Sequence, residues 1–257
     1  MCLSSDKYAI FLDIDGTLMG QSEAALARNI EVIQKVRALG HKVLINTGRS
    51  TAYLPKNIDI KKHFDGFISG AGSRVVIDRK EIFSKPVELA SVQSFCRVCF
   101  GLENECIIEG TEEMYCVEAE ENKETRWQCI TRENVDQIVK NGMLVEKFTL
   151  LGQCPQEVGE ALGDGFIVMQ HGGYAEIVQA GYTKAEAMGI VLDALNIKPE
   201  NSIAMGDSLN DYDMIEKAGI GVAMGNAIEE IKNIATFVTD NVNDAGVATA
   251  LKKIFGL

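Results

Sequence analysis

The sequence predicts an α/β protein in which a parallel sheet is assembled from the two ends of the chain and an α+β domain is inserted between them. Two observations carry this prediction. Near both termini, short apolar runs alternate with amphipathic segments of helical length, which is the pattern of βαβ units. In the middle of the chain this alternation stops, and predicted strands follow one another directly. We place the core in residues 1–83 and 179–257 and the inserted domain in residues 84–178.

In the N-terminal part of the core, the sequence predicts three strands and one long helix. Residues 8–12 form an apolar run that ends in a polar turn, as a buried strand does. Ser22 is a suitable N-cap for a helix whose apolar positions keep helical spacing until Gly40, a typical C-terminal stop. The apolar residues 42–46 and 67–68 supply the next two strands.

The remaining elements follow from the same two periodicities. In the C-terminal part of the core we expect helices over 184–195, 210–218 and 228–235, and strands over 202–205, 221–223 and 236–238. In the inserted domain we expect helices over 88–100, 133–140 and 156–162, and strands over 105–109, 114–119, 145–151, 166–170 and 174–178.

The composition disfavours several function classes. The 37 acidic residues outnumber the 25 basic ones and give a formal charge of −12, which disfavours nucleic acids and anionic membranes as partners. No apolar run approaches the roughly 20 residues that span a bilayer, and the N-terminus lacks the charged-then-apolar order of a secretory signal. The seven cysteines, odd in number and sparse, are typical of reduced thiols. We therefore expect a cytoplasmic protein that is a monomer or a weak homodimer.

Two pairs of acidic residues follow predicted strands of the core. Asp13 and Asp15 come directly after the first strand, and Asp207 and Asp211 come after the strand over 202–205. Taken alone, each pair is explained more simply by helix caps and turns. Because the carboxyl ends of parallel strands meet at one edge of a sheet, we expect all four carboxyl groups to lie together there. A bound hard cation such as Mg²⁺ would explain why four carboxyl groups lie together.

The groups next to these carboxylates suit a phosphate. Thr47 and Gly48 end the second strand and offer a hydroxyl and backbone N–H groups, and Arg49 adds a guanidinium. Lys184 lies at the start of a predicted helix, where a cation is unfavourable against the helix dipole unless it faces a negative group. For any single lysine, a solvent-exposed position remains the simpler explanation.

Four motifs occur in the order Asp13-Ile14-Asp15-Gly16-Thr17, Thr47-Gly48-Arg49, Lys184, and Gly206-Asp207 with Asn210-Asp211. Together they resemble the four-motif signature of the haloacid dehalogenase-like phosphatases. Residues 221–227 and 244–247 are similar to the Cof-type subgroup, whose large cap is inserted between the second and third motifs. The resemblance implies a Rossmann-like parallel-sheet core with an inserted α+β cap domain.

The resemblance also implies roles for the acidic residues. Asp13 would attack phosphorus and form an aspartyl-phosphate, and Asp15 would protonate the leaving oxygen and then activate water. Mg²⁺ would be held by Asp13, the backbone carbonyl of Asp15, and Asp207. Asp211 would bind the ion through water or orient the site.

For the phosphate, the resemblance implies binding by Thr47, Gly48 and Lys184. Asn210 would position Lys184 or bind the phosphate itself. The chain departs from the subgroup at residues 69–73, Ser-Gly-Ala-Gly-Ser, where Cof-type proteins often carry an Asn-Gly-Ala turn. This departure removes an amide side chain from the rim of the expected site.

The sequence therefore predicts a Mg²⁺-dependent phosphatase that acts on a small phosphate ester, such as a sugar phosphate or a phosphorylated cofactor. A sugar phosphomutase is an alternative, but it must hold a second phosphate, and the cap has only three arginines, Arg97, Arg126 and Arg132. A non-catalytic phosphometabolite-binding protein is a further alternative, which the intact set of carboxylates argues against.

The acidity of the chain is concentrated in the predicted cap. Acidic residues outnumber basic ones by 17 to 7 in residues 85–176, so that −10 of the net charge of −12 lies there. An acidic cap would oppose the entry of a bare dianion. We therefore expect substrates with a neutral or cationic body to be favoured over bisphosphates.

Overall fold

The computed structural model describes residues 6–119 and 127–257, and the chain divides into two compact units. The first, here called the core, comprises Met1–Gly48, Lys56–Phe83 and Thr183–Leu257; the second, here called the cap, comprises Arg49–Pro55 and Ser84–Tyr182. Residues 49–55 thus cluster with the cap, although they lie in the sequence range that we assigned to the core. Cys2 lies outside the described residues.

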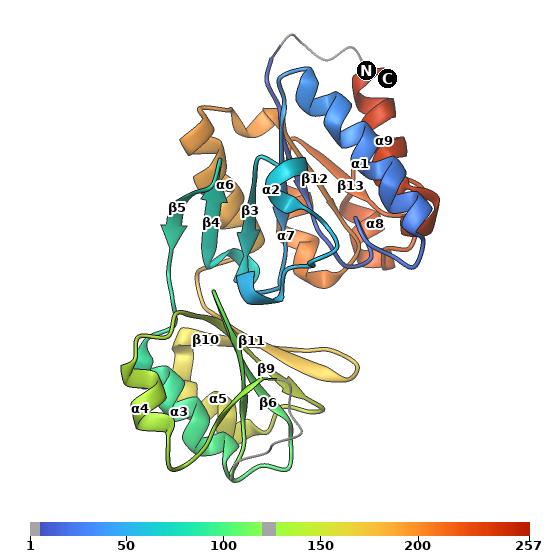
Figure 1. Ribbon diagram of the computed structural model, residues 1–257. Helices are drawn as coiled ribbons and strands as arrows, with labels where there is room; N and C mark the ends of the chain where they lie inside the picture. Colours follow the sequence, from blue (N-terminus) through green and yellow to red (C-terminus); the bar gives the residue numbers. More distant parts are fainter. Residues whose placement is uncertain (1–5, 120–126) are drawn as a thin grey trace. The chain divides into compact units, whose positions relative to one another are not determined.

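In the described residues, the core contains a sheet with the order β14-β13-β12-β1-β2-β3-β4-β5 (Figure 1). The strands predicted from the sequence pair in parallel, from β14 to β3. This arrangement confirms the predicted α/β fold class. The bounds are β1 Ala9–Leu12, β2 Lys42–Asn46, β3 Gly66–Ser69, β4 Arg74–Ile77, β5 Lys80–Ser84, β12 Ser202–Gly206, β13 Ile220–Ala223 and β14 Phe237–Val238.

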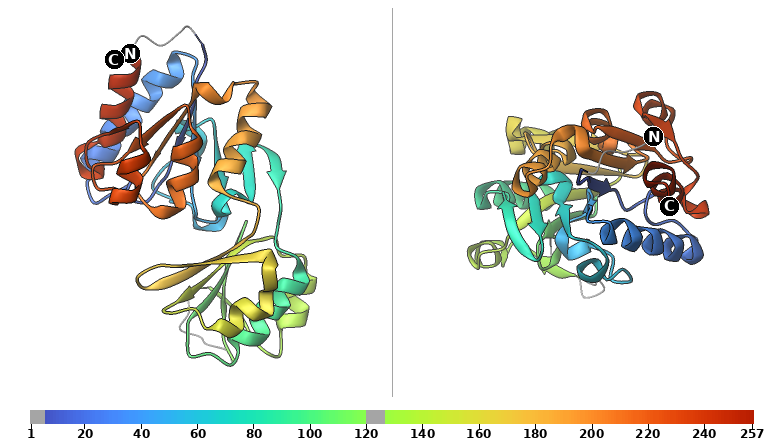
Figure 2. Two further views of the ribbon diagram at one scale, coloured as in Figure 1. Left: turned by 180° about the vertical axis from the view of Figure 1, so that it is seen from behind. Right: turned by 90° about the horizontal axis from the view of Figure 1, so that it is seen from above.

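Helices cover both faces of the core sheet, which explains why the central strand β1 is uniformly apolar and fully buried. Helices α1 and α9 pack together on one face, and α6 and α7 pack together on the other (Figures 1 and 2). Ser22 caps α1 as predicted, because its side chain accepts the N–H of Ala25. The core helices are α1 Glu23–Ala38, α2 Ile60–His63, α6 Lys184–Leu195, α7 Tyr212–Lys217, α8 Glu229–Ile234 and α9 Gly246–Phe255.

Strands β4 and β5 were not expected from the sequence, and β4 pairs with β3 in an antiparallel sense. The turn between them places Asp78 and Arg79 at φ values of +47° and +67°. Two consecutive positive φ angles suit the twist of a tight hairpin, and the sequence of such turns usually contains Asn-Gly or Asp-Gly. Because this turn contains no glycine, the usual sequence signal is missing.

The described part of the cap forms an α+β unit with a sheet in the order β10-β11-β9-β6-β7-β8. Three helices, α3, α4 and α5, lie on one face of this sheet (Figure 1) and bury an apolar cluster against it that includes the stacked rings of Phe95 and Phe148. The bounds are α3 Leu89–Cys99, α4 Val135–Lys140, α5 Gln156–Leu162, β6 Cys106–Gly110, β7 Met114–Val117, β8 Gln128–Ile130, β9 Val145–Leu151, β10 Phe166–Gln170 and β11 Tyr174–Gln179.

The short segment 49–55 is tied to this cap by side-chain hydrogen bonds. The backbone N–H and the hydroxyl of Thr51 both donate to the carboxylate of Glu146 on β9, over 3.1 and 2.6 Å. The hydroxyl of Ser50 lies 3.5 Å from the sulfur of Met114 on β7. The cap is therefore built from two separate stretches of sequence.

Two further expectations from the sequence concern reduced cysteines and the absence of membrane-spanning segments. Six described cysteines carry free thiols, and four of them, Cys96, Cys99, Cys106 and Cys116, are buried in the cap. Among the residues that the structure describes, no helix combines the length and the apolarity that crossing a membrane requires.

Asp65 fastens the helix α1 to the first strands of the core. Its carboxylate accepts from Arg37 Nε and Nη2 over 3.0 and 3.2 Å, and from the backbone N–H of Val43 over 2.9 Å. Lys42 Nζ lies 3.2 Å away. Burial raises the pKa of Asp65, but the hydrogen bonds from Arg37 and Val43 lower it by a larger amount, so that the net shift is downward.

The variant Asp65→Asn should lower the free energy of unfolding by about 1–2 kcal/mol at pH 7, because charge-assisted hydrogen bonds are lost. The native carboxylate contributes stability above the ordinary aspartate pKa and loses it as the pH falls through its lowered native pKa. The difference between variant and wild type should therefore shrink below about pH 3, as urea denaturation at several pH values would measure. The exposed control Asp164→Asn should change stability by less than about 0.5 kcal/mol at any pH.

Candidate active site

The predicted site residues of the core gather at the carboxyl ends of neighbouring parallel strands. Asp13 follows β1, Thr47 follows β2, and Asp207 follows β12. The registers Leu12 to Met205 and Leu12 to Ile45 place these three strand ends side by side. This sheet edge is where open α/β sheets bind ligands.

Lys184 is the centre of this group. Its Nζ lies 2.7 Å from Asp13 Oδ1 and 2.6 Å from Asp211 Oδ1, and 3.3 Å from Asn210 Oδ1. The side chain is only 2% exposed. Thr183 caps the helix by accepting the N–H of Glu186, so that α6 begins at Lys184 as predicted. The expectation that this lysine faces a negative group is met by two buried carboxylates.

The charges of the site depend on one another. Burial alone would lower the pKa of Lys184. Asp13 and Asp211 raise it by a larger amount, so the net shift is upward and the ammonium stays charged. Burial raises the pKa of Asp13 to about 8, with Lys184 opposing the shift and Asp211 and Asp207 adding to it. Three carboxyl groups, those of Asp13, Asp207 and Asp211, thus share the site with one lysine.

Asp211 organises the loop that follows β12. Its Oδ2 accepts the backbone N–H groups of Asp207 and Ser208 over 2.9 and 3.1 Å, and the side chain is fully buried. Burial and the neighbouring Asp211 raise the pKa of Asp207 to about 6, while the hydroxyl of Thr17, 3.1 Å from Asp207 Oδ1, lowers it. The short loop thus holds two carboxylates close together.

The site has the donors for a divalent cation. One oxygen from each of Asp13, Asp207 and Asp211 lies within 4.8 Å of the other two. An all-oxygen set with excess negative charge suits a hard ion such as Mg²⁺. Asp211 already shares its oxygens with Lys184 and two backbone N–H groups, so Asp13 and Asp207 are better placed for direct coordination.

Asp15 is exposed, in contrast to Asp13, and the turn that carries it depends on Gly16. Gly16 has a φ of +79°, and a Cβ there would lie 2.3 Å from Asp207 Oδ2. The amide of Asn226 donates to the Gly16 carbonyl over 2.8 Å and accepts the N–H of Val242 over 2.9 Å. Both conformation and space therefore require glycine at this position.

Thr47 and Gly48 are buried at the end of β2. The backbone of Thr47 is fixed from both sides, since its N–H donates to the Ile68 carbonyl over 3.0 Å and its carbonyl accepts the N–H of Ala71 over 3.2 Å. The preceding residue, Asn46, donates from its amide to the main-chain carbonyl of Lys184 over 3.0 Å. The end of β2 thus helps to hold the start of α6.

Residues 69–73, where the sequence departs from the subgroup, pack against the start of α6. Ala71 adopts a φ of +55°, and a Cβ on Gly72 would lie 2.4 Å from the carbonyl oxygen of Thr183. Small residues therefore allow this turn to approach the start of α6.

Three residues of the site were not singled out from the sequence. Thr17, Asn46 and Asn226 hold Asp207, Lys184 and the Gly16 turn through contacts with residues 138 to 210 positions away. Asn226 lies within the segment that carried the Cof-type resemblance, which was the one sequence signal for it. Thr17 lies within the first motif, and Asn46 directly precedes the second.

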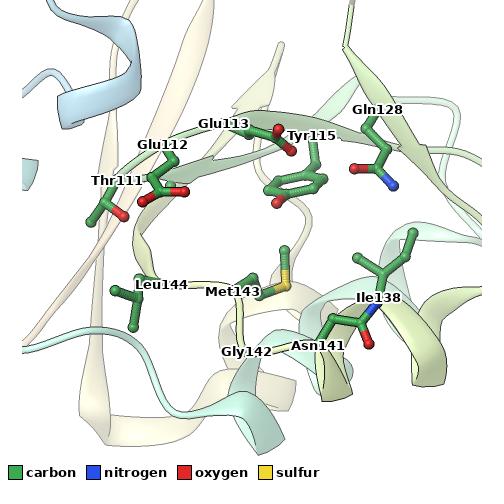
Figure 3. Close-up of a pocket in the computed structure, with 11 residues that line it drawn as sticks. Thr111, Glu112, Glu113, Tyr115, Gln128, Ile138, Asn141, Gly142, Met143 and Leu144 are labelled. Atoms are coloured by element: carbon green, nitrogen blue, oxygen red, sulfur yellow. The ribbon is translucent and has the colours of Figure 1, made fainter.

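The cap has a hollow of its own, with a volume of about 340 Å³. Figure 3 shows Glu112, Glu113 and Tyr115 along one wall, and Met143 and Leu144 along the opposite wall. None of the predicted site residues lines this hollow. The hollow is lined by cap residues alone.

The variant Gly16→Ala should reduce any activity of the site by at least about 100-fold, because the methyl group would displace the Asp207 carboxylate. It should also destabilise the fold by about 1–3 kcal/mol through the positive φ. Gly189→Ala is the matched control: apart from the neighbouring residues of its own helix, no atom lies within 4 Å of its Cβ position on α6. Thermal unfolding should show a gain of about 0.5–1 kcal/mol for the control, and a loss there would contradict the packing argument.

Comparisons with known proteins agree with this geometry. Residues 10–251 match the family model of the haloacid dehalogenase-like hydrolases. The chain is 29% identical to YkrA, a candidate phosphatase of Bacillus subtilis, over 97% of this chain and 98% of that protein. It is 27% identical to the phosphoglycolate phosphatase of Methanopyrus kandleri, over 95% of this chain and 96% of that protein.

A solved structure shows the same likeness in three dimensions. BT1666 of Bacteroides thetaiotaomicron, described among phosphatases of the haloalkanoate enzyme superfamily, superposes with a TM-score of 0.80 at 25% identity, over 98% of this chain and 96% of that one. The family model covers most of the chain, and three of the four predicted carboxyl groups, those of Asp13, Asp207 and Asp211, lie close together with Lys184. The chain belongs to the haloacid dehalogenase-like hydrolase family.

Proposed function

We propose that the protein is a Mg²⁺-dependent phosphatase that hydrolyses a small phosphorylated metabolite through an aspartyl-phosphate intermediate. The observation that carries the proposal is the buried contact of Lys184 with Asp13 and Asp211, beside the carboxylate of Asp207. The broader class, phosphoric monoester hydrolase, follows from the family and from relatives named as phosphatases.

Asp13 has the position of a nucleophile. It lies at the end of a rigid central strand, and Lys184 fixes the orientation of its carboxylate. In the proposed reaction an Oδ atom of Asp13 bonds to phosphorus while the ester oxygen leaves. Asp15, two residues further on and exposed, donates a proton to the leaving oxygen and afterwards takes one from the water that hydrolyses the intermediate.

The phosphoryl group is held by residues from three elements. Thr47 and Gly48 offer a hydroxyl and backbone N–H groups at the end of β2, and Lys184 offers a positive charge at the start of α6. Asn210 lies next to the Lys184 ammonium and keeps it in place. These groups balance the charge that spreads over the transferring phosphoryl oxygens.

Mg²⁺ would be held by Asp13, the backbone carbonyl of Asp15, and Asp207. When bound, the ion neutralises charge on the phosphoryl oxygens. Asp211 contributes as a positioning residue, since its two oxygens hold Lys184 and the backbone of the loop.

The phosphomutase alternative has less support. It requires cationic groups in the cap for a second phosphate, and the described arginines of the cap are Arg49, Arg97 and Arg132. Arg49 Nη1 donates to the carbonyl of Tyr53 over 3.3 Å. Arg132 instead donates to the carbonyl of Phe100 over 3.0 Å. Arg126 lies outside the described residues.

The variant Asp13→Asn should abolish the Mg²⁺-dependent hydrolysis of p-nitrophenyl phosphate, with a loss of at least about 1,000-fold, because the amide cannot attack phosphorus. Release of p-nitrophenol is the measurement. The exposed Asp193→Asn on α6 removes the same charge and should retain wild-type turnover. Activity in Asp13→Asn near that of this control would rule out the proposed nucleophile.

The variant Asp207→Asn should raise the Mg²⁺ concentration for half-maximal activity by about 10–100-fold, because one ligand charge is lost. Titration of Mg²⁺ into protein stripped with a chelator is the measurement. An unchanged midpoint, together with a lowered maximal rate, would show that Asp207 acts on the phosphate rather than on the metal.

A further inference from the structure

Two asparagines of the described core are fully buried, Asn46 at the end of β2 and Asn29 in the middle of α1. Asparagine is uncommon in strands, and the three residues before Asn46 on β2 are apolar and equally buried. A buried amide needs partners for its oxygen and for its nitrogen. The partners of the two side chains therefore show what each residue does.

The amide nitrogen of Asn46 contacts two helices that begin at the candidate site. It donates to the main-chain carbonyl of Lys184, the first residue of α6, over 3.0 Å. It also lies 3.5 Å from the sulfur of Met214 on α7, the helix that begins directly after Asp211. One side chain thus joins the end of β2 to both elements that follow or carry the buried ion pairs.

The oxygen of Asn46 is not used in this way. In the part of the chain that the structure describes, Oδ1 of Asn46 has no hydrogen-bond partner, although the side chain is fully buried. A buried acceptor without a donor lowers stability, and an apolar side chain would remove that cost. The stability of the fold therefore does not explain why an amide stands at this position.

Asn29 provides the contrast. Its Oδ1 accepts the backbone N–H of Ala248 over 2.9 Å, while its nitrogen has no partner among the described residues. Ala248 is the third residue of α9, and the first N–H groups of a helix have no acceptor within the helix. Asn29 therefore supplies a partner that the start of α9 needs, which is a contribution to stability.

The carbonyl that Asn46 contacts has no comparable need. A carbonyl in the first turn of an α-helix accepts the N–H four residues further on, so the carbonyl of Lys184 already belongs to the hydrogen-bond pattern of α6. The bond from Asn46 is an addition to that pattern. What it adds is position, because it ties the main chain of Lys184 to the end of β2.

The position of this main chain determines where the Lys184 ammonium lies. The ammonium contacts Asp13 over 2.7 Å and Asp211 over 2.6 Å, and the side chain is only 2% exposed. In a close-packed interior, a displaced main chain cannot be compensated by a free choice of side-chain conformation. A misplacement of about 1 Å in a reacting group can cost about 100-fold in rate. The bond from Asn46 therefore acts on the geometry of the site.

We propose that Asn46 is a positioning residue for phosphoryl transfer, whose amide fixes the start of α6 so that the Lys184 ammonium lies between Asp13 and Asp211. This inference rests on the proposed phosphatase function. Asn46 acts through Lys184 rather than through its neighbour Thr47. The backbone of Thr47 is held by Ile68 and Ala71, and neither bond involves the Asn46 side chain.

Two variants of Asn46 test the proposal by Mg²⁺-dependent hydrolysis of p-nitrophenyl phosphate and by thermal unfolding. Asn46→Ala should lower kcat and kcat/KM by the same factor, at least about tenfold, because the contact matters most in the transition state. Asn46→Val fills the space with an apolar side chain that suits a buried strand. It should show the same loss of kcat with a melting temperature equal to or above that of the wild type.

Asn29→Ala is the matched control, because it removes the same amide from an equally buried position. The opposite pattern is expected. The melting temperature should fall by about 2–4 °C, because a backbone N–H at the start of α9 loses its acceptor. The value of kcat should stay within about twofold of the wild type, since Asn29 does not contact α6 or α7 through a hydrogen bond.

Each outcome decides between the two roles. Wild-type kcat in either folded variant of Asn46 overturns the inference and leaves the phosphatase standing. Equal losses of kcat in Asn29→Ala and Asn46→Val also overturn it, because any buried amide of the core would then have the same effect. If both Asn46 variants fail to fold, Asn46 has a structural role and the inference is wrong. No release of p-nitrophenol by the wild-type protein with Mg²⁺ overturns both the inference and the proposed function.

Discussion

The buried ammonium of Lys184 is the interaction on which the core site depends. Asp13 and Asp211 both lie out of contact with bulk water, and Lys184 pairs with both. Removal of one partner from a buried ion pair costs about 3–5 kcal/mol, because the remaining charge is left uncompensated. The main chain of the lysine is fixed as well, through Asn46. The end of β1, the end of β2, the loop after β12 and the start of α6 therefore hold one another.

This mutual dependence explains how an arrangement of like charges persists in a folded protein. Burial is the main cause of the raised pKa values of Asp13 and Asp207, and repulsion from neighbouring carboxylates adds to it. The fold offsets this repulsion with a single lysine and with backbone N–H groups aimed at Asp211. The charge that remains after these contacts suits the site to a divalent cation.

Much of the core could be predicted because its signals are local. Apolar runs gave the parallel strands, Ser22 marked the start of α1, and the motif residues lie at strand ends, where topology brings them together. The hairpin β4–β5 could not be predicted, since the turn at Asp78 and Arg79 lacks glycine. The roles of Asn46 and Asn226 could not be predicted either, because their partners are distant in sequence.

The cap shows a further limit of sequence reasoning. Counting charges identifies an acidic domain but does not say where the charge lies. In the described part of the cap, Glu109, Glu146 and Glu176 are buried, whereas most other acidic residues are exposed to solvent. A buried carboxylate acts on its neighbours much more strongly than one in water, so the total charge does not describe the electrostatics inside the cap.

The hydrogen bonds between Thr51 and Glu146 have a consequence for the way such proteins diversify. Seven residues that directly follow Thr47 and Gly48 belong to the cap, although they are separated from the rest of it by Lys56–Phe83. A recombination event that exchanged only the long insertion would bring a new β9 against the old Thr51. The two hydrogen bonds of Thr51 would then persist only if the new strand carried an acceptor at the position of Glu146.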